Sequence, residues 1–251
     1  MGGASRNEKK RKQEAANARL RAAGITPPSA RSSDSRRTTF IAVAVLAVVA
    51  LVVGVVVLLT RGSGEPVAAT YASSADGGIV TAGSGPVVVD IYEDYLCPVC
   101  ERLEERYGGE LTTAANNGQI TVRYHAVAIL DSRTDPAGFS TRAANAALCS
   151  VPAGVFPGYY QALFDNQPAE GSAGLTDAQL VTFGTDLGAT GDFAGCVTGA
   201  ANAGSVRAET QSALRDPAVL NPDGQFGTPT VLLNGARVDT SDTNWLQNAL
   251  A

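Results

Sequence analysis

The sequence predicts an α/β domain that contains an inserted helical segment and follows one transmembrane helix. Three observations carry this prediction: an uninterrupted apolar run at residues 40–59, a β-branched strand that leads directly into Cys97-Pro98-Val99-Cys100, and a helix-rich block of about 80 residues between two strand-bearing segments. A strand, a helix, a second strand, a helical block and a final hairpin follow one another along the chain. This order is typical of a mixed α/β layer structure.

The apolar run predicts a membrane anchor. Residues 40–59 contain twenty residues without a charged or polar side chain, and at ~1.5 Å per residue a helix of this length spans roughly 30 Å, the thickness of a bilayer core. A cleaved signal peptide, cut near Val67-Ala68-Ala69, is the alternative, but its apolar region would be about 7–15 residues. A buried globular helix is disfavoured because it would present a polar face.

Charge is divided sharply on the two sides of this run. Residues 1–39 hold ten Lys/Arg and three Asp/Glu, whereas residues 60–251 hold nine Arg, 21 Asp/Glu and no Lys. Because basic flanks stay in the cytoplasm, we expect residues 1–39 to form a disordered cytoplasmic tail and the rest to lie outside. Residues 60–77, rich in Gly, Ser and Ala, predict a flexible stalk. The acidic outer domain argues against a nucleic-acid partner.

The dithiol motif falls between a predicted strand and a predicted helix. Residues 86–92 are β-branched and aromatic and predict a buried strand, while the residues after Cys100 have helical composition with oppositely charged pairs. Pro98 suits the first turn of a helix, where no N–H partner is needed. We therefore expect the motif at the N-terminus of a helix.

The remaining segments complete the predicted domain over residues 78–251. Residues 118–125 predict a second strand, in which His125 is interpreted as an ordinary strand residue. Residues of about 136–215 are Ala-rich and helical, too long for a loop, and predict an inserted helical subdomain. Residues 227–238 predict a hairpin around Asn-Gly, and 241–250 a short last helix.

The spacing of Cys97 and Cys100 favours thiol-disulfide exchange. The attacking species is a thiolate, and both the helix N-terminus and the neighbouring Cys100 are expected to lower the pKa of Cys97. We predict that Cys97 is the exposed nucleophile and Cys100 the buried resolving thiol. A zinc site would require a second pair of Cys or His ligands. The other two cysteines are isolated, and His125 is the single histidine. A structural disulfide is the other alternative, and we expect no metal or cofactor.

Thr228-Pro229 stands at the entrance to the predicted hairpin. In this position a proline loop in the cis conformation would lie against the dithiol, and cis peptide bonds are essentially a proline feature. Its backbone could then pair with a substrate segment beside the sulfurs. An ordinary trans turn proline is the alternative.

Residues 94–100, residues 226–230 and Asn234-Gly235 together resemble the DsbA-like branch of the thioredoxin superfamily, in particular the membrane-tethered forms of actinobacteria and other Gram-positive bacteria. The resemblance covers roughly residues 78–250. It implies a thioredoxin fold with an inserted helical subdomain and a cis bond before Pro229. It also implies disulfide formation in exported proteins, with reoxidation by a VKOR-like or DsbB-like membrane protein.

Two features depart from that family pattern. Val99 replaces the histidine often found in the proteobacterial members, so one imidazolium that would stabilise the thiolate is missing. The outer domain has no Lys, so the buried Lys–carboxylate pair of some relatives is absent. Glu93 or Asp94 is the candidate carboxylate that relays a proton to Cys100.

Cys149 and Cys196 both fall in the helical block. We expect them to form a structural disulfide that closes a loop of about 48 residues and stabilises the fold by about 4 kcal/mol. Two buried free thiols are the alternative, although an even cysteine count outside the membrane favours pairing.

Two classes of function remain open from the sequence. The first is an enzyme that introduces disulfides, while a reductase or isomerase would use the same dithiol. The second is a non-catalytic, membrane-tethered thioredoxin-like domain for binding or sensing, in which Cys97 and Cys100 form a structural disulfide.

Overall fold

The computed structural model describes residues 3–24 and 67–251. The predicted anchor at 40–59 and residues 60–66 of the predicted stalk lie outside the described residues. None of the helices within the two described ranges combines the length and the apolar character needed to cross a bilayer. The chain divides into two units, residues 1–64 and 65–251.

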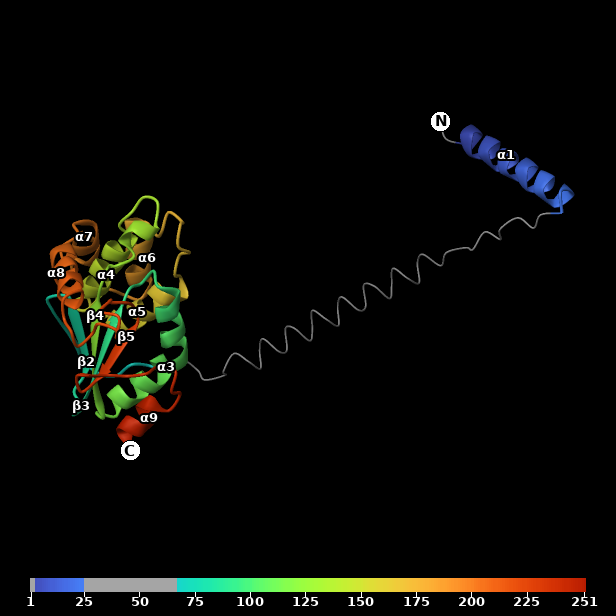
Figure 1. The fold of residues 1–251 in the computed structure, drawn as a ribbon. Helices are drawn as coiled ribbons and strands as arrows, with labels where there is room; N and C mark the ends of the chain where they lie inside the picture. The colour runs from blue at the N-terminus through green and yellow to red at the C-terminus, as the bar shows by residue number, and fades with distance from the viewer. Residues whose placement is uncertain (1–2, 25–66) are drawn as a thin grey trace. The chain divides into compact units, whose positions relative to one another are not determined.

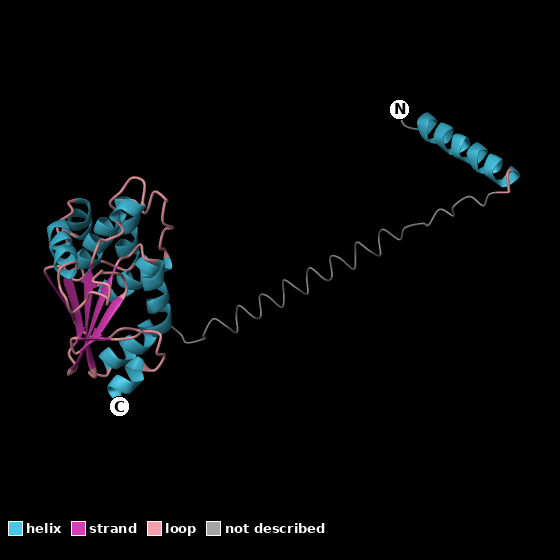
Figure 2. Cartoon of the chain, viewed as in Figure 1, coloured by secondary structure: helices cyan, strands magenta, loops and turns pink. Residues whose placement is uncertain are grey.

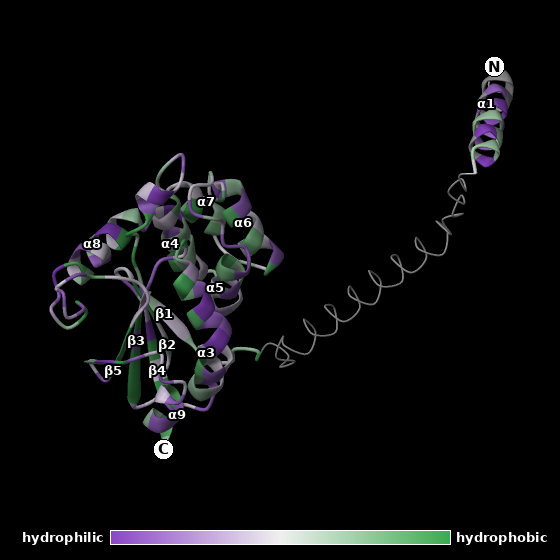
Figure 3. Ribbon diagram, turned by 45° about the vertical axis from the view of Figure 1, so that its right-hand side comes forward, coloured by the Kyte–Doolittle hydropathy of each residue, from purple (hydrophilic) through white to green (hydrophobic). Residues whose placement is uncertain are grey.

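The first unit contains helix α1, Gly3–Ala22. The sequence predicts a disordered tail here, whereas the structure has a helix over these residues. Ala, Glu, Lys, Arg and Gln have high helix propensity, and Lys12 Nζ lies 2.8 Å from Glu8 Oε1 one turn away. The polar character of the helix is visible as purple in Figure 3.

The second unit is built on one six-stranded sheet with the order β1-β2-β4-β3-β5-β6. Strands β3 and β4 are parallel, and every other neighbouring pair is antiparallel. Figure 2 shows the sheet in magenta. The strands are β1 (Ser73–Asp76), β2 (Ile79–Gly83), β3 (Val87–Glu93), β4 (Ile120–Ala126), β5 (Thr230–Leu233) and β6 (Ala236–Arg237).

Strand β1 occupies part of the segment that the sequence predicts to be stalk. Gly77-Gly78 forms the turn into β2, and Gly77 has a positive φ of 57°, which a glycine adopts without steric cost. The backbone N–H groups of Thr70 and Tyr71 also donate to Asn116 Oδ1, at 2.7 and 3.2 Å. The ordered domain therefore begins before residue 78.

Helices cover the sheet and one of its ends. Helices α4 to α8 fall within the predicted insertion, and α4 contacts each of the other four; α4, α6, α7 and α8 lie above the sheet in Figure 1. The predicted hairpin and last helix are present at β5–β6 and α9. The helices are α3 (Pro98–Asn116), η1 (Asp131–Arg133), α4 (Phe139–Ser150), α5 (Phe156–Asp165), α6 (Asp177–Asp186), α7 (Phe193–Thr198), α8 (Ala203–Ala213) and α9 (Trp245–Leu250).

The alternation of strand β3 creates two buried environments. Successive side chains in a strand point to opposite faces. Val89 and Ile91 join the main hydrophobic cluster with α3 and α5, and Glu93 follows on this face. Tyr92 joins a second cluster with α8 and β5, and Asp90 lies on this other face. Figure 3 shows green, apolar stretches on the strands between α3 and α8.

Candidate active site

The dithiol lies where β3 passes into α3, as predicted. Cys97 is the N-cap of α3 with an extended backbone (φ −80°, ψ 114°), and Pro98 is the first helical residue. The carbonyl of Cys97 accepts hydrogen bonds from the N–H groups of Cys100, at 3.0 Å, and Glu101, at 3.2 Å. The first turn of α3 thus places the sulfur of Cys97 at the positive end of the helix dipole.

The two sulfurs have opposite environments. Cys97 and Cys100 are both free thiols in the described part of the chain. A hydrogen bond from Cys100 lowers the pKa of Cys97 to about 6, partly opposed by burial, with further help from the Thr228 side chain and backbone N–H groups. Burial, and then hydrogen bonding to Cys97, raises the pKa of Cys100 well above its ordinary value.

Exposure differs from the prediction for one of these residues. Cys100 is 0% exposed, as expected for a resolving thiol, but Cys97 is 5% exposed rather than open. Its Sγ–H donates to the carbonyl of Thr228 at 3.4 Å, so the loop before β5 covers it. The exposed side chain beside the dithiol is Val99, at 47%.

The Thr228-Pro229 peptide bond is cis. The antiparallel pairing of Thr230 with Tyr92, at the end of β3, positions this loop. The hydroxyl of Thr230 also donates to the carbonyl of Gly227 at 2.7 Å. Strand pairing therefore brings together residues separated by 131 positions, Cys97 and Thr228.

Glu93 is a fully buried acid behind the dithiol. The hydroxyl of Tyr160 donates to Oε2 at 2.8 Å. Among the described residues, Oε1 has no hydrogen-bond partner. Burial raises the pKa of Glu93 well above its ordinary value, and the Tyr160 hydrogen bond only partly opposes this. Burial therefore favours the neutral, protonated form of the carboxyl group.

Asp94 has a different arrangement. Its Oδ1 accepts the N–H of Leu96, and its Oδ2 accepts the N–H of Leu130, both at 2.9 Å. Burial raises the pKa of Asp94 to about 6, and the backbone hydrogen bonds oppose the shift. Oδ1 thus braces the loop before Cys97, and Oδ2 ties this loop to the segment that precedes α4.

Two residues near the site were not identified from the sequence. The amide of Gln167, in the loop after α5, donates to the carbonyls of Tyr95 at 3.1 Å and Cys97 at 3.2 Å. Tyr160 reaches Glu93 from α5. These contacts join residues 67 to 72 positions apart, so no local spacing signals them.

Cys149 and Cys196 are joined by a disulfide that links α4 to α7. Their Cα atoms are 5.9 Å apart, and 47 positions separate them. The disulfide lies inside the helical subdomain, and neither cysteine is at a junction of strand and helix.

His125 lies on the opposite face of the sheet and is more than an ordinary strand residue. Its Nδ1 is 2.7 Å from Glu209 Oε1 on α8, and its Nε2 is 2.9 Å from Asp90 Oδ1 on β3. Burial lowers the pKa of His125, but the hydrogen bonds and charges of Asp90 and Glu209 together outweigh it, so the pKa is raised. Arg123 also donates to Asp90, at 2.7 Å.

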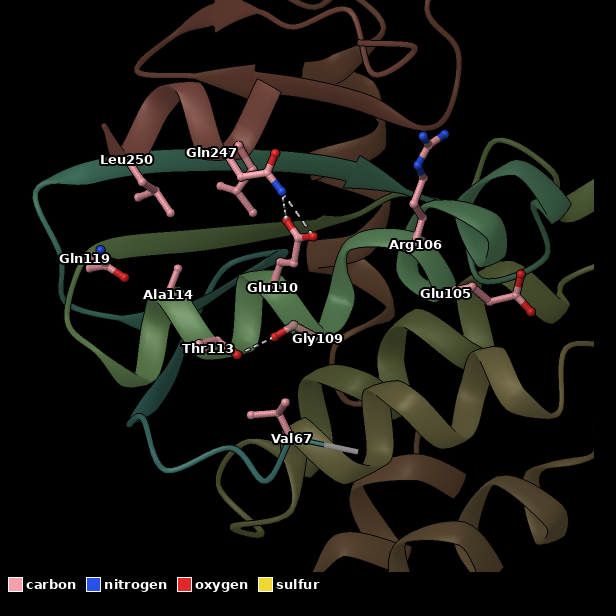
Figure 4. Close-up of a pocket in the computed structure, with 11 residues that line it drawn as sticks. Val67, Glu105, Arg106, Gly109, Glu110, Thr113, Ala114, Gln119, Gln247 and Leu250 are labelled. Atoms are coloured by element: carbon pink, nitrogen blue, oxygen red, sulfur yellow. Dashed lines mark hydrogen bonds between the residues drawn. The ribbon is translucent and has the colours of Figure 1, made fainter. Parts of the chain in front are cut away.

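A separate surface hollow lies between α3 and α9. Figure 4 shows Glu110 accepting hydrogen bonds from Gln247, with Ala114 and Leu250 nearby. Neither thiol and no residue of the Thr228-Pro229 loop lines it. Among residues 3–24 and 67–251, no three His, Cys, Asp or Glu side chains are grouped to hold a metal ion.

A low-pKa cysteine at a helix N-terminus, paired with a buried high-pKa cysteine beside a cis-proline, defines a dithiol site for thiol-disulfide exchange. The chain belongs to the thioredoxin family, whose model, described as thioredoxin, matches residues 79–250. The thioredoxin fold predicted from the sequence is therefore confirmed.

Solved structures agree with this assignment. Oxidised DsbA from Mycobacterium tuberculosis is 27% identical with a TM-score of 0.59, over 72% of this chain and 90% of that one. MdbA, a thiol-disulfide oxidoreductase from Corynebacterium diphtheriae, shares the fold, with 22% identity and a TM-score of 0.62 over 74% of this chain and 96% of that one. The predicted DsbA-like resemblance is confirmed, and the chain has the fold of protein thiol-disulfide oxidoreductases.

A curated relative is a longer protein. The serine/threonine-protein kinase PknE of Mycobacterium tuberculosis is 30% identical over 177 residues, which is 68% of this chain and 31% of the kinase. The chain thus spans about a third of the length of that curated relative.

Proposed function

We propose that this chain is an extracytoplasmic oxidase that introduces disulfide bonds into exported proteins through Cys97 and Cys100. The observation that carries the proposal is the opposite environment of the two thiols, with the pKa of Cys97 lowered to about 6 and that of Cys100 raised. A stable Cys97 thiolate favours the reduced form of the dithiol. It therefore favours transfer of the disulfide to a substrate.

The reaction has two exchange steps. A substrate thiolate attacks Cys97 Sγ in the Cys97–Cys100 disulfide, and the sulfur of Cys100 leaves and takes up a proton. A second substrate thiolate then attacks the substrate sulfur of this mixed disulfide and displaces Cys97 as a thiolate. The substrate loses two electrons, and the dithiol gains them.

The surrounding residues support these steps. The backbone at Thr228 and Pro229 binds the substrate segment beside Cys97, and the Thr228 side chain stabilises the thiolate. Glu93 relays a proton to Cys100. Asp94, the other candidate for that relay, holds the loop before Cys97 through its two backbone hydrogen bonds.

The Cys149–Cys196 disulfide has a structural role in this proposal. By the chain-entropy relation, a crosslink across 47 positions stabilises the helical subdomain by about 4 kcal/mol. Its position away from any strand–helix junction supports this role over a redox one.

The location follows from the charge pattern of the sequence. The charge pattern supports a basic cytoplasmic tail over residues 1–39, an anchor at 40–59, a stalk over 60–77 and an extracytoplasmic domain over 78–251. The substrates are thiols of exported proteins. A VKOR-like or DsbB-like membrane protein reoxidises the dithiol, and the exchange needs no cofactor.

The reduction potential of the detergent-solubilised full chain tests the proposal. We expect a value nearer ~−120 mV, typical of DsbA, than ~−270 mV, typical of thioredoxin. Cys97→Ser abolishes oxidation of a reduced peptide, whereas Cys100→Ser accumulates mixed disulfides. A potential near that of thioredoxin would instead support a reductase or isomerase with the same dithiol.

A second candidate is a membrane-tethered sensor domain with a structural Cys97–Cys100 disulfide. The similarity to one third of a protein kinase favours it. If Cys97 reacts with a thiol probe no faster than Cys149 or Cys196 after mild reduction, the sensor function replaces the enzyme.

A further inference from the structure

The loop after α5 reaches the dithiol through one side chain. Helix α5 ends at Asp165, and Pro168 disfavours a helical backbone at the residue before it, so Gln167 leaves the helix. Its side-chain amide donates to the carbonyls of Tyr95 at 3.1 Å and Cys97 at 3.2 Å. The loop between β3 and α3 is thus held from the helical subdomain.

The two acceptors fix the orientation of the Gln167 amide. Both are carbonyl oxygens, which cannot donate, so the nitrogen of the amide must face them. Within the described part of the chain, no other donor reaches the carbonyl of Tyr95, and Tyr95 is 1% exposed. Loss of the Gln167 amide would therefore leave a buried carbonyl without its partner, which is unfavourable.

The same amide completes the hydrogen bonding around the backbone of Cys97. The Cys97 N–H donates to the Asp94 carbonyl at 2.9 Å. The Cys97 carbonyl accepts the N–H groups of Cys100 and Glu101, and Gln167 adds a side-chain donor to that carbonyl. Both peptide groups of Cys97 are therefore held, which keeps this residue in the extended N-cap conformation of α3.

The N-cap conformation brings the Cys97 sulfur to the backbone donors of α3. A side chain at the N-cap can accept the free N–H groups of the first helical turn. Besides the thiol of Cys100, which has the largest effect, backbone N–H groups at Val99 and Cys100 lower the pKa of Cys97 to about 6. A rotation of the Cys97 backbone would move its sulfur away from these donors.

The loop that carries Gln167 is itself fixed to the rest of the helical subdomain. The N–H of Gly171 donates to the carbonyl of Arg133 at 2.6 Å. The N–H of Asp135 donates in the other direction, to the carbonyl of Ser172 at 2.9 Å. These two hydrogen bonds join the loop to the segment that precedes α4, so the amide of Gln167 is held in place.

We propose that Gln167 is a positioning residue for the exchange reaction, which holds Cys97 in the conformation that lets its sulfur bond the N–H groups at the start of α3. The proposal rests on the thiol-disulfide chemistry proposed above for Cys97 and Cys100. Gln167 acts through the backbone of Cys97 rather than on its sulfur. The helical subdomain thereby becomes part of the site, together with the Thr228-Pro229 loop.

The titratable groups around the Cys97 sulfur come from the two elements that flank it. Cys100 lies on α3, and the buried carboxyl groups of Glu93 and Asp94 lie at the end of β3. Gln167 is uncharged, so an uncharged replacement leaves the charges around the sulfur the same. A changed pKa of Cys97 in such a variant therefore reports the hydrogen bonds of its thiolate.

The test is the pH profile of Cys97 alkylation by iodoacetamide in the reduced, detergent-solubilised full chain, over a range that brackets the pKa of about 6. Gln167→Met keeps the length of the side chain and removes its donors, whereas Gln167→Ala truncates it. We expect the midpoint to rise by about one pH unit in both variants, the size of one lost hydrogen bond to a charged group.

Asn166→Ala is the matched control. This adjacent side-chain amide donates to the Ala162 carbonyl at 2.9 Å rather than to the loop before α3, so its pH profile should match that of wild type.

The equilibrium with glutathione gives a second readout. A rise in the pKa of Cys97 from about 6 to about 7 weakens the stabilisation of the reduced dithiol at pH 7 about fivefold, which lowers the reduction potential by about 20 mV. Asn166→Ala should keep the wild-type potential.

Wild-type pH profiles in both Gln167 variants, even with lowered stability, would overturn the proposal, because Gln167 would then serve only the fold. A shift in Gln167→Ala alone would also overturn it, since packing rather than donation would then hold Cys97. If Gln167→Ala does not fold, Gln167→Met decides the question. Since iodoacetamide reacts with the thiolate whatever the biological direction of exchange, failure of the oxidase proposal would show separately, as a lack of peptide oxidation by wild type.

Discussion

The two faces of the central sheet bury carboxyl groups in opposite ways. On the side of α3 and α5, Glu93 is fully buried with one tyrosine hydroxyl as its partner, and its pKa is raised. On the side of α8, Asp90 is 1% exposed but contacts both His125 and Arg123, and its pKa is lowered although burial acts against this. The two residues are only three positions apart on β3.

This difference shows that the partners, rather than burial alone, decide the protonation state of a buried acid. Among the residues that the structure describes, Glu93 has no cationic partner, so its neutral form is favoured. Asp90 stays ionised because an imidazolium and a guanidinium compensate its lost hydration. We infer that the face with Glu93 serves the redox chemistry, whereas the face with Asp90 fastens α8 to the sheet.

The largest expected effect comes from breaking the charged face. His125→Ala leaves Asp90 and Glu209 without their shared partner, and we expect the free energy of unfolding to fall by about 3 kcal/mol or more. Urea unfolding at pH 6 measures this loss. On the opposite face, Tyr160→Phe removes one hydrogen bond and should cost about 1 kcal/mol. Equal losses in the two variants would contradict the proposed division between the faces.

An intermediate effect is expected at Glu93, and it depends on pH. Because its pKa is raised in the folded state, the folded protein holds a proton that the unfolded chain releases above its ordinary pKa of 4.5. The stability contributed by this group is therefore present below that pH and falls as pH rises towards the folded pKa, by up to about 1.4 kcal/mol per pH unit.

Glu93→Gln mimics the neutral acid and should remove this decline. Unfolding measured from pH 4.5 to 8 should show the variant gaining stability relative to wild type as pH rises. Glu105→Gln, on the exposed surface of α3, controls for the change in net charge. A pH-independent difference between Glu93→Gln and wild type would mean that Glu93 is ionised in the folded protein.

The smallest effect concerns Arg123, whose side chain is 45% exposed. Arg123→Gln should lower stability by less than about 1 kcal/mol, as for other solvent-exposed ion pairs, while it leaves the contact between Asp90 and His125. His125 is the single histidine of the chain, so its NMR titration is free of overlap and should give a pKa above 6.5.

The pH dependence of the stability contributed by His125 is opposite to that of an acid whose pKa is lowered in the folded state. Stability from its ion pairs is fully present below the ordinary pKa of 6.5 and is lost as pH rises through the raised folded pKa. Asp90→Asn should move the NMR pKa down, and Arg123→Gln should not lower it. A pKa below 6.5 in wild type would show that burial outweighs the two carboxylates.

The elements that carry the site could be predicted from local patterns. The β-branched residues before Cys97, the proline after it and the Asn-Gly turn each restrict nearby backbone angles, and the strand, the helix and the hairpin follow them. The hairpin β1–β2 was not predicted, because its Gly77-Gly78 turn lies in a segment whose small residues favoured a stalk interpretation. The helical propensity of residues 3–22 was likewise underestimated from their charge.

By itself, therefore, the sequence determined the order of strands and helices, the helical insertion and the two cysteines of the dithiol, because these depend on short-range patterns. The thioredoxin fold followed from the resemblance to the DsbA-like family. Only the tertiary structure placed Thr228 over Cys97, Tyr160 on Glu93, Gln167 on the carbonyl of Cys97, and Asp90 and Glu209 on His125. Each of these contacts joins residues at least 35 positions apart. Hydrogen bonding and burial shift pKa values through distances in space, which separation along the chain does not specify.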